Sequence, residues 1–483
     1  MRAKGTFYFT THFFIKTIGM YQDNLILMAD AYKYSHHRLY VTGTEKIYSY
    51  LESRGGQFSE TVFFGLQYFL KRYLEGEVFT KEGLEEAMPF LHGVFGRNDV
   101  VCRENFEYVI EEYGGHLPVR IKAVQEGRRV PVSNVLMTIE NTDPNCFWLT
   151  NFLETLLMQL WYPCTVATLS AEIRKVINAY YAKTSSAESE AGIDYVLNDF
   201  GFRGVSSVES AGIGGMAHLL NFRGSDTVIG SRYAQLYYGA NEVRGQSIPA
   251  TEHSVMTLRG EAGELEIFKH ILETYPTGNV ACVSDSYDIF RACSTYWGEE
   301  LKEAVLKRNG TLVIRPDSGD PVMTLKKIFE ILFDKFGFTL NEKGYKVLPK
   351  QVRVIQGDGI NYDSICEIYE ALTKEQIAAE NLVLGMGGGL LQKINRDTQK
   401  FAFKCSYAEI NGKGVEVKKR PMEMNAKGEI NPSFKTSKGG RLKLIVNNGL
   451  YQTVKEHEFP DFKDELIPIF ENGRILKTHA LFK

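Results

Sequence analysis

The sequence predicts an α/β protein that combines an α/β barrel with a mixed α+β domain formed from the N- and C-terminal segments. In the middle of the chain, short apolar runs ending in Gly, Asp or Arg alternate with amphipathic helical patterns, which is typical of a parallel sheet. The flanking regions mix strand-like and helical patterns without this alternation. We expect a disordered N-terminal extension over residues 1–23 and the first part of the mixed domain over 24–190. The barrel is expected over 191–404, and a segment that returns to the mixed domain over 405–483.

The N-terminal third contains one clear strand pattern and two helical patterns. Residues 46–54 alternate like a strand, whereas residues 61–76 and 149–162 carry apolar residues at helical spacing, and we expect their aromatic side chains in the core. The first twenty residues have no clean apolar stretch and no small-residue cleavage site. We interpret them as an extension that begins at a start codon upstream of Met20, with a secretory signal as the alternative.

Four strand–turn–helix units form the expected barrel. The predicted strands lie in residues 280–285, 311–319, 352–359 and 382–389, and helical patterns follow, as in residues 286–297 and 321–336. Such repeats predict a parallel sheet with its catalytic loops at the carboxyl ends of the strands. A closed or nearly closed barrel fits this spacing better than an open sheet does. After residue 405 the pattern is again polar and strand-like, includes a basic loop at 418–441, and is expected to pair with the N-terminal third.

Composition and charge exclude several classes of function. Of the 483 residues, 44% are apolar and 24% charged, and the net charge is −3, so no global field attracts nucleic acid or a membrane surface. Any anionic ligand must therefore be held by a local cluster. No apolar run approaches the roughly 18 residues that a membrane span needs. Seven scattered cysteines without a C-x-x-C pair argue against a disulfide framework or zinc cage and favour a cytoplasmic location.

Chemically useful residues follow each of the four predicted strands. They are Asp285, then Arg315 with Asp317, then Asp358, then Gly387, Gly388 and Gly389. A barrel brings such strand ends together around one pocket. Carboxylates bind sugar hydroxyls or hold magnesium through water, arginine binds phosphate oxygens, and glycines let backbone N–H groups approach a phosphate. Because Leu390 occupies the sixth position of the glycine run, the run is not a G-x-G-x-x-G dinucleotide fingerprint.

Two further clusters precede these strands. Phe200 and Arg203 share one tight turn, where the aromatic ring could stack a flat ligand and the cation bind a phosphate; a packed Phe beside a surface Arg is the alternative. His253 follows Glu252. A single histidine is more often structural, but a neighbouring carboxylate in a phosphate-binding cleft favours proton transfer or phosphoryl acceptance. The residues alone thus indicate a magnesium-dependent sugar-phosphate enzyme.

In this order, these clusters resemble the nicotinamide phosphoribosyltransferase family from about Asn24 to the C-terminus. The resemblance rests on long motifs, which are ADAYKYSHH (29–37), ETVFFGLQY (60–68), HLPVRIKAV (116–124), NTDPNCFWLTNFLET (141–155), WYPCTVAT (161–168), DFGFRGVSS (199–207), GSDTV (224–228), PATEHS (249–254), VSDSYDI (283–289), IRPDSG (314–319), VIQGDG (354–359), GGGLLQK (387–393) and FKCSY (403–407). It implies a homodimer with a phosphoribosyltransferase-type α/β barrel and with active sites shared between subunits. It also implies a pentosyltransferase that makes nicotinamide mononucleotide and pyrophosphate in NAD salvage.

The resemblance assigns the nicotinamide site to four residues. The ring is expected between Phe200 and Tyr32 of the partner subunit, beside Arg315, with Asp226 accepting a hydrogen bond from the carboxamide. The carboxylate would repel nicotinate, so the amide is selected.

The resemblance assigns the phosphoribosyl pyrophosphate site to a larger set. The pyrophosphate ligands are Arg203, Arg315, Lys419 and Lys435; the ribose ligands are Asp317 and Asp358; the 5′-phosphate ligands are Gly387, Gly388, Arg396 and Lys404; and Gly357 lines the same site. Arg396, Lys404 and Asp30 are expected from the other subunit.

His253 is expected, on the same resemblance, to be phosphorylated by ATP, with Glu252 and Asp285 orienting it and its Mg²⁺ and Asp285 reaching the metal through water. With Asp317, these residues form the expected catalytic group. Three positions depart from the family pattern: Asn198 replaces a His, Met386 a small polar residue, and Ala402 a Ser. The first and third remove polar contacts worth about 1 kcal/mol each.

Three other functions compete with this interpretation. A nicotinate phosphoribosyltransferase shares the fold and the histidine chemistry. A catalytically inactive binding or signalling protein would have lost the histidine, aspartates or arginines, all of which are present. A sugar-phosphate aldolase or isomerase would need a Schiff-base lysine or a dedicated base, and none of the four strand ends supplies a lysine.

Overall fold

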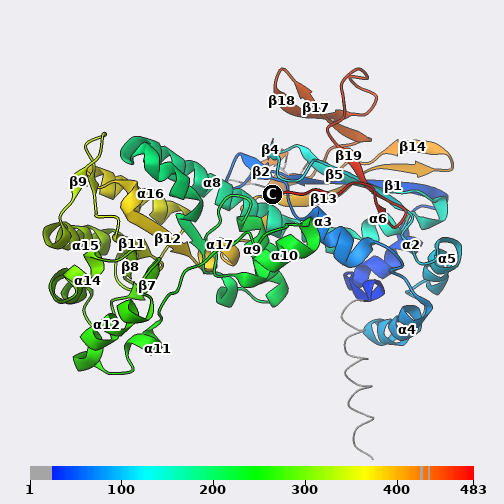
Figure 1. The fold of residues 1–483 in the computed structure, drawn as a ribbon. Coiled ribbons are helices and arrows are strands. Elements are labelled where there is room, and N and C mark those ends of the chain that lie inside the picture. The colour runs from blue at the N-terminus through cyan, green and yellow to red at the C-terminus, as the bar shows by residue number, and fades with distance from the viewer. Residues whose placement is uncertain (1–23, 425–427, 433–435, 483) are drawn as a thin grey trace, which may run out of the picture. The chain divides into compact units, whose positions relative to one another are not determined.

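The computed structural model describes residues 24–424, 428–432 and 436–482, which form two compact units (Figure 1). The mixed unit contains the chain up to Cys164 together with Arg396–His479. The barrel unit contains Thr165–Asn395 and the last residues from Ala480. The extension expected over residues 1–23, and Lys435, lie outside the described residues.

A five-stranded parallel sheet forms most of the barrel. Its strands are, in spatial order, β6 (Leu197–Asp199), β12 (Leu382–Met386), β11 (Val352–Gln356), β8 (Leu312–Arg315) and β7 (Val280–Val283). The last four confirm the strands predicted from the sequence. Their apolar side chains are buried, as expected of parallel strands that are covered on both faces.

Two short segments close this sheet into a ring. Asp199 in β6 bridges Ser225, Gly224 bridges Gln246, and Ala250 bridges Ala281 in β7, all in parallel. Backbone hydrogen bonds accompany the bridges, including those from the Asp226 N–H to the Asp199 carbonyl (2.9 Å) and from the Thr251 N–H to the Ala281 carbonyl (3.0 Å). The described residues therefore confirm a barrel, and it is closed.

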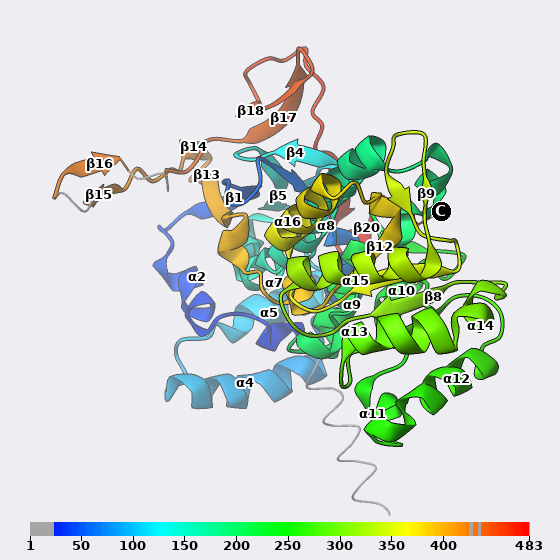
Figure 2. The ribbon, with the colours of Figure 1, turned by 90° about the vertical axis from the view of Figure 1, so that its left-hand side faces the viewer.

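Helices surround the parallel strands (Figures 1 and 2). They include α9 (Val208–His218), α10 (Val228–Tyr238), α12 (Glu264–Thr274), α14 (Lys302–Leu306), α15 (Pro321–Phe336) and α16 (Tyr362–Lys374). Helix α15 spans the predicted residues because Asp320 caps its first turn and Pro321 occupies its first position. The pattern at 286–297 forms α13 (Ile289–Arg291) and continues as a π-helix, Ala292–Glu300.

The mixed unit is built on an antiparallel sheet that joins both ends of the chain. Its strands, in spatial order, are β14 (Lys413–Glu416), β13 (Phe401–Ile410), β1 (Thr44–Ser53), β5 (Val135–Asn141), β3 (Val119–Ala123), β19 (Ile467–Glu471) and β20 (Arg474–Ile475). The C-terminal strands β13 and β19 pair with β1 and β3 respectively, which confirms the expected return of the C-terminal segment.

Smaller elements complete the two units. Those of the mixed unit include β2 (Glu60–Val62) with β4 (Arg129–Pro131), β15 (Met422–Met424) with β16 (Ile430–Pro432), β17 (Leu442–Asn447) with β18 (Leu450–Lys455), α2 (His36–Leu39), α4 (Lys81–Phe95) and α5 (Arg103–Tyr113). Those of the barrel unit include β9 (Thr339–Leu340) with β10 (Lys346–Val347), α11 (His253–Met256) and α17 (Gly388–Leu391).

Two predicted helices are interrupted. The pattern at 61–76 begins in strand β2, and Gly65, with φ +104°, precedes the helical turns α3 (Leu66–Phe69) and Leu70–Leu74. Pairing with β4 thus overrides the helical spacing there. The pattern at 149–162 divides into α6 (Leu149–Phe152), α7 (Glu154–Met158) and the start of α8 (Trp161–Thr184).

The boundaries between the compact units, at residues 164/165 and 395/396, differ from the predicted domain boundaries at 190/191 and 404/405. In α8, Ser170 contacts His218 and Arg174 pairs with Asp194, so this helix packs in the barrel unit before residue 191. Strand β13 pairs with β1, so residues 401–404 lie in the mixed unit. None of the helices described here is long and apolar enough to cross a membrane.

Candidate active site

The carboxyl ends of the barrel strands carry the predicted catalytic residues. Asp285 follows β7, Arg315 ends β8, Gly357 and Asp358 follow β11, and Gly387 follows β12. Because the strands run in parallel around a closed ring, these residues lie at one end of the barrel. The structure thus brings together residues that the sequence separates by about a hundred positions.

A chain of polar contacts links His253 to Arg315. Nε2 of His253 lies 3.2 Å from Oδ1 of Asp285, and its Nδ1 lies 4.0 Å from Oδ2 of Asp317. Oδ2 of Asp285 accepts hydrogen bonds from the Asp317 N–H (2.9 Å) and the Ser318 hydroxyl (2.6 Å). The Asp285 side chain is almost fully buried, whereas that of His253 is 48% exposed. A fixed carboxylate therefore orients an imidazole that a ligand can reach.

Arg315 connects this chain to the aromatic platform. Its Nη2 donates to Oδ1 of Asp317 at 2.8 Å, and its guanidinium carbon lies 5.5 Å from the centre of the Phe200 ring. The Arg315 Nε is buried and has no hydrogen-bond partner in the described structure. The Arg315 side chain keeps 16% of its surface exposed, so the guanidinium group can still meet an anionic or carbonyl-bearing ligand.

Phe200 packs on the interior of the barrel. Its half-buried ring contacts the cluster formed by Ala281, Val313 and Ile355. A Cβ at position 385 would stand 2.0 Å from Cε2 of Phe200, so only a glycine there lets strand β12 pass the Phe200 ring. The Phe200 ring thus has the fixed position that stacking on a flat ligand requires.

Asp199, which the sequence analysis did not single out, holds the Phe200 turn in place. Its side chain is fully buried, and its Oδ1 accepts a hydrogen bond from the Gly201 N–H at 2.7 Å. Burial raises the pKa of this carboxyl to about 6. An aspartate beside two glycines in a tight turn is a sequence signal that could have identified it.

Asp226 and Ser247 face each other on the two segments that close the barrel. The Ser247 hydroxyl donates to Oδ1 of Asp226, and both residues are exposed. Ser247 was also missed, because a lone serine between Gln246 and Ile248 has no spacing that marks it. The second carboxylate oxygen of Asp226 can accept a hydrogen bond from a donor group on a ligand.

The remaining barrel residues are placed as follows. Arg203 is exposed in the 3-10 turn Phe202–Gly204, and a Cβ at Gly204 would lie only 3.5 Å from Cα of Gly388. The Asp358 side chain is exposed just beyond β11. The hydroxyl of Ser254 donates to the carboxylate of Glu252, so the orienting contact to His253 comes from Asp285 rather than Glu252.

The residues expected from a second subunit lie in the mixed unit. Tyr32 is 56% exposed, and Asp30 accepts a hydrogen bond from the Thr155 hydroxyl at 2.8 Å. Burial lowers the pKa of Lys404. The carboxylate of Glu154 opposes this shift, whereas the positive charges of Arg54, Lys419 and Arg396 add to it. Lys404, Arg396 and Lys419 thus belong to one cationic group in this unit.

The three departures from the family pattern occupy structural positions. The Asn198 amide donates to the backbone carbonyls of Tyr195 (3.1 Å) and Leu384 (3.3 Å). Met386 is buried, and its backbone carbonyl accepts the Phe200 N–H at 3.0 Å. Ala402 is buried in β13 opposite Glu52.

Family comparisons agree with this arrangement. The nicotinate phosphoribosyltransferase (NAPRTase) family matches residues 195–445, and the nicotinamide phosphoribosyltransferase N-terminal domain matches residues 24–121. A nicotinamide phosphoribosyltransferase of Xanthomonas campestris pv. campestris is 43% identical over 471 residues, covering 95% of this chain and 97% of the relative. One of Acinetobacter baylyi is 32% identical over 501 residues, covering 95% and 96% respectively.

Solved structures share the fold at low sequence identity. The nicotinate-nucleotide pyrophosphorylase of Pyrococcus furiosus has a TM-score of 0.55 at 15% identity, covering 93% of this chain and 90% of that one. Human nicotinic acid phosphoribosyltransferase has a TM-score of 0.52 at 15% identity, covering 94% and 91%.

Proposed function

The chain belongs to the nicotinamide phosphoribosyltransferase family, a family of pentosyltransferases, and from this membership we propose that it transfers the phosphoribosyl group of phosphoribosyl pyrophosphate to nicotinamide. The observation that carries the proposal is the convergence of Phe200, Arg315 and the His253–Asp285 pair at one end of the barrel. The products are nicotinamide mononucleotide and pyrophosphate, which suits a role in NAD salvage in the cytoplasm.

The reaction exchanges one bond at the anomeric carbon of the ribose. The pyridine nitrogen forms the new C–N bond, the C–O bond to pyrophosphate breaks, and the electron pair leaves with pyrophosphate. Stacking on Phe200 holds the pyridine ring, while Asp317 and Asp358 hold the ribose hydroxyls. Arg203 and Arg315, with Lys419 and Lys435, bind the leaving group. Positioning and charge stabilisation together provide the catalysis.

Magnesium fits this site as a ligand of the substrate phosphates. No group of three or more His, Cys, Asp or Glu among the described residues forms a metal cage. Asp285 and Asp317 are joined by a hydrogen bond from the Asp317 N–H to the Asp285 carboxylate, and magnesium in phosphate-binding sites is typically bound by one or two carboxylates, water and phosphates. When bound, Mg²⁺ neutralises charge on the leaving pyrophosphate. The two carboxylates would hold it, Asp285 through water.

We further propose that ATP phosphorylates His253. The contact between Nε2 and Asp285 favours a proton on Nε2, which leaves the lone pair of Nδ1 as the nucleophile. The N–P bond forms as the bond to the γ-phosphorus of ATP breaks and ADP leaves. Phosphorylation adds roughly two negative charges beside the pyrophosphate site, where they would organise magnesium. Glu252 is the N-cap residue of α11, the helix that begins with His253. It would therefore influence the phosphohistidine only by positioning the start of this helix.

A second copy of the chain would complete the site. Tyr32, Asp30, Arg396 and Lys404 are the residues we propose that it contributes, with Tyr32 covering the open face of the nicotinamide ring and the cations binding the 5′-phosphate near Gly387 and Gly388. Their support is the family membership together with the exposure of Tyr32 and Arg396. Mixing an Arg396→Ala subunit with a Phe200→Ala subunit should restore activity if the sites are shared.

Nicotinate is the second candidate substrate, because the family that matches residues 195–445 is described by that name. Asp226 favours nicotinamide, since a carboxylate accepts a hydrogen bond from an amide but repels a carboxylate. The test is to supply each pyridine with phosphoribosyl pyrophosphate and Mg²⁺, with and without ATP, and to measure both mononucleotides by mass spectrometry. We expect nicotinamide mononucleotide to dominate, and preferential formation of nicotinate mononucleotide would establish the second candidate instead.

A further inference from the structure

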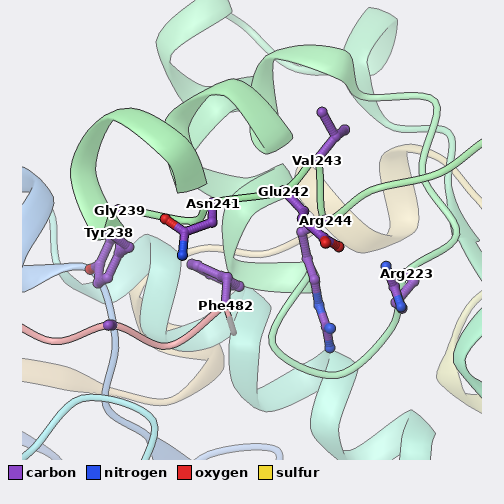
Figure 3. A pocket seen from close by; sticks show the side chains of 9 residues that line it. Arg223, Tyr238, Gly239, Asn241, Glu242, Val243, Arg244 and Phe482 are labelled. Carbon is purple, nitrogen blue, oxygen red and sulfur yellow. The ribbon is translucent and has the colours of Figure 1, made fainter.

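A cavity lies in the barrel unit, at the opposite end of the segments that carry Asp226 and Ser247. It has a volume of about 430 Å³. Its lining includes Arg223 and Arg244, which directly precede the two segments that close the barrel, and Phe482 near the C-terminus (Figure 3). Since the candidate active site occupies the carboxyl ends of the strands, this cavity is separate from it.

Two arginines give the cavity its chemistry. The Nε atoms of Arg223 and Arg244 are both buried, and neither has a hydrogen-bond partner among the described residues. Glu242 also lines the cavity, but no ion pair joins it to either arginine in the described chain. One carboxylate against two guanidinium groups leaves a net positive charge. The Nε atoms themselves have almost no accessible surface, but no hydrogen bond or ion pair joins either guanidinium group to the described residues, so the lining is suited to an acceptor that the protein itself does not supply.

The other side of the cavity carries two aromatic rings and the polar side chain of Asn241 (Figure 3). The rings of Tyr238 and Phe482 meet edge to face at 5.7 Å, and both are buried. Buried rings lower the local dielectric constant and so strengthen the attraction between a guanidinium group and an anion. Arginine is the side chain best matched to the oxygens of a phosphate.

We propose that this cavity binds a phosphate group, either as the free anion or as part of a small phosphomonoester, between Arg223 and Arg244. Each arginine precedes by three positions a residue of the candidate active site, Asp226 and Ser247 respectively. The two segments are hydrogen-bonded to each other through the Ser225 N–H and the Gln246 carbonyl (2.9 Å) and through the Gln246 N–H and the Arg223 carbonyl (2.7 Å).

A phosphate that bridges the two arginines therefore fixes the relative position of the two segments. At their far ends, the same segments set the contact between Asp226 and Ser247. Occupancy of the cavity is thereby coupled to the site that faces the pyridine substituent. The coupling is expected to change the KM for nicotinamide about fivefold or more, the range typical of linked sites.

Binding is tested directly by crystals grown with selenate, a tetrahedral oxyanion that gives an anomalous signal. We expect a peak between Arg223 and Arg244 in the unaltered protein and in Arg232→Gln, an exposed arginine of α10 that serves as the matched control. The peak should be absent from Arg244→Gln and from Arg223→Gln. No peak in the unaltered protein, or a peak that persists in both cavity variants, would overturn the proposal. This result does not depend on any activity of the enzyme.

Coupling is tested by the KM for nicotinamide at saturating phosphoribosyl pyrophosphate, with inorganic phosphate or adenosine monophosphate added. The KM of the unaltered protein and of Arg232→Gln should change on this addition, and the KM of Arg244→Gln should not. A stronger response to adenosine monophosphate identifies a phosphomonoester as the ligand, and a stronger response to inorganic phosphate identifies the free anion. An equal response in all three proteins would place the effect at the active site and overturn the coupling.

Discussion

Nε2 of His253 lies 3.2 Å from Oδ1 of Asp285, whose other carboxylate oxygen accepts the backbone N–H of Asp317. This contact ties an exposed member of the candidate catalytic group to the segment that follows strand β8. It supports the proposed ATP relay, whereas the aromatic platform and the arginine support the transfer itself. The two activities can therefore be separated by substitution.

Replacing His253 with alanine should abolish stimulation by ATP and leave weak nicotinamide transfer. The substrate platform does not include His253, so the unstimulated rate should change little. Initial rates with and without ATP measure this directly. His270→Ala, an exposed histidine of α12, is the matched control and should respond to ATP like the unaltered protein. Undiminished ATP stimulation of His253→Ala would eliminate the phosphohistidine.

Replacing Asp226 with asparagine should reduce the preference for nicotinamide over nicotinate. The variant loses the negative charge that repels nicotinate, and a gain of about tenfold in the relative kcat/KM for nicotinate corresponds to about 1.4 kcal/mol. The control is Ser247→Ala, which retains the carboxylate and should retain the preference. An Asp226→Asn enzyme with an unchanged ratio of the two kcat/KM values would show that another group selects the amide.

Replacing Gly385 with alanine should raise the KM for nicotinamide. The new Cβ would stand 2.0 Å from Cε2 of Phe200 and force the ring to move, so stacking should weaken by about 1 kcal/mol or more, or roughly fivefold. Gly192→Ala is the control, because nothing lies within 4 Å of its Cβ. A normal KM in Gly385→Ala would mean that the position of the Phe200 ring is not important for binding nicotinamide.

Replacing Asp199 with asparagine should stabilise the protein at neutral pH relative to acidic pH. The pKa of Asp199 is about 6 in the folded protein and 3.8 in its ordinary state, so the folded state binds the proton more tightly. The stability that the protonated carboxyl contributes is fully present below pH 4 and is lost as the pH rises towards 6 and above. This loss is about 3 kcal/mol, taking 1.36 kcal/mol for each pKa unit.

The asparagine does not titrate, so the difference in melting temperature between Asp199→Asn and the unaltered protein should become more positive between pH 4.5 and pH 7.5. Asp334→Asn, an exposed side chain of α15, is the control. A constant difference for Asp199→Asn over this range would show that folding does not raise the pKa of the Asp199 carboxyl.

The sequence predicted those parts of the fold that are set by local pattern. Strands β7, β8, β11 and β12 and helix α15 follow from apolar runs, a capping aspartate and a proline at the first helical position. The strand spacing favoured a closed or nearly closed barrel, but the segments that close it could not be located in this way. Closure depends on bridges at Gly224, Gln246 and Ala250, which involve too few residues to form a recognisable strand pattern.

The candidate site was predictable where chemically useful residues follow several parallel strands in succession, because a barrel brings those strand ends together. Asp285, Arg315 and Asp317 were identified for this reason, and the structure places them in contact. Ser247 and Ser318 could not be identified, because a serine in a loop has no distinguishing spacing and only the folded backbone brings it to a carboxylate. The helical prediction at 61–76 failed because the strand pairing of β2 with β4 and the left-handed Gly65 interrupt it.

Phosphorus NMR of the unaltered protein with phosphoribosyl pyrophosphate, Mg²⁺ and nicotinamide tests the central claim most directly. Phosphoribosyl transfer predicts that the pyrophosphate signal and the phosphomonoester signal of nicotinamide mononucleotide grow together in equal amounts, and that neither grows without a pyridine. Pyrophosphate release that does not depend on nicotinamide, or consumption of nicotinate alone when both pyridines are supplied, would contradict the proposed function.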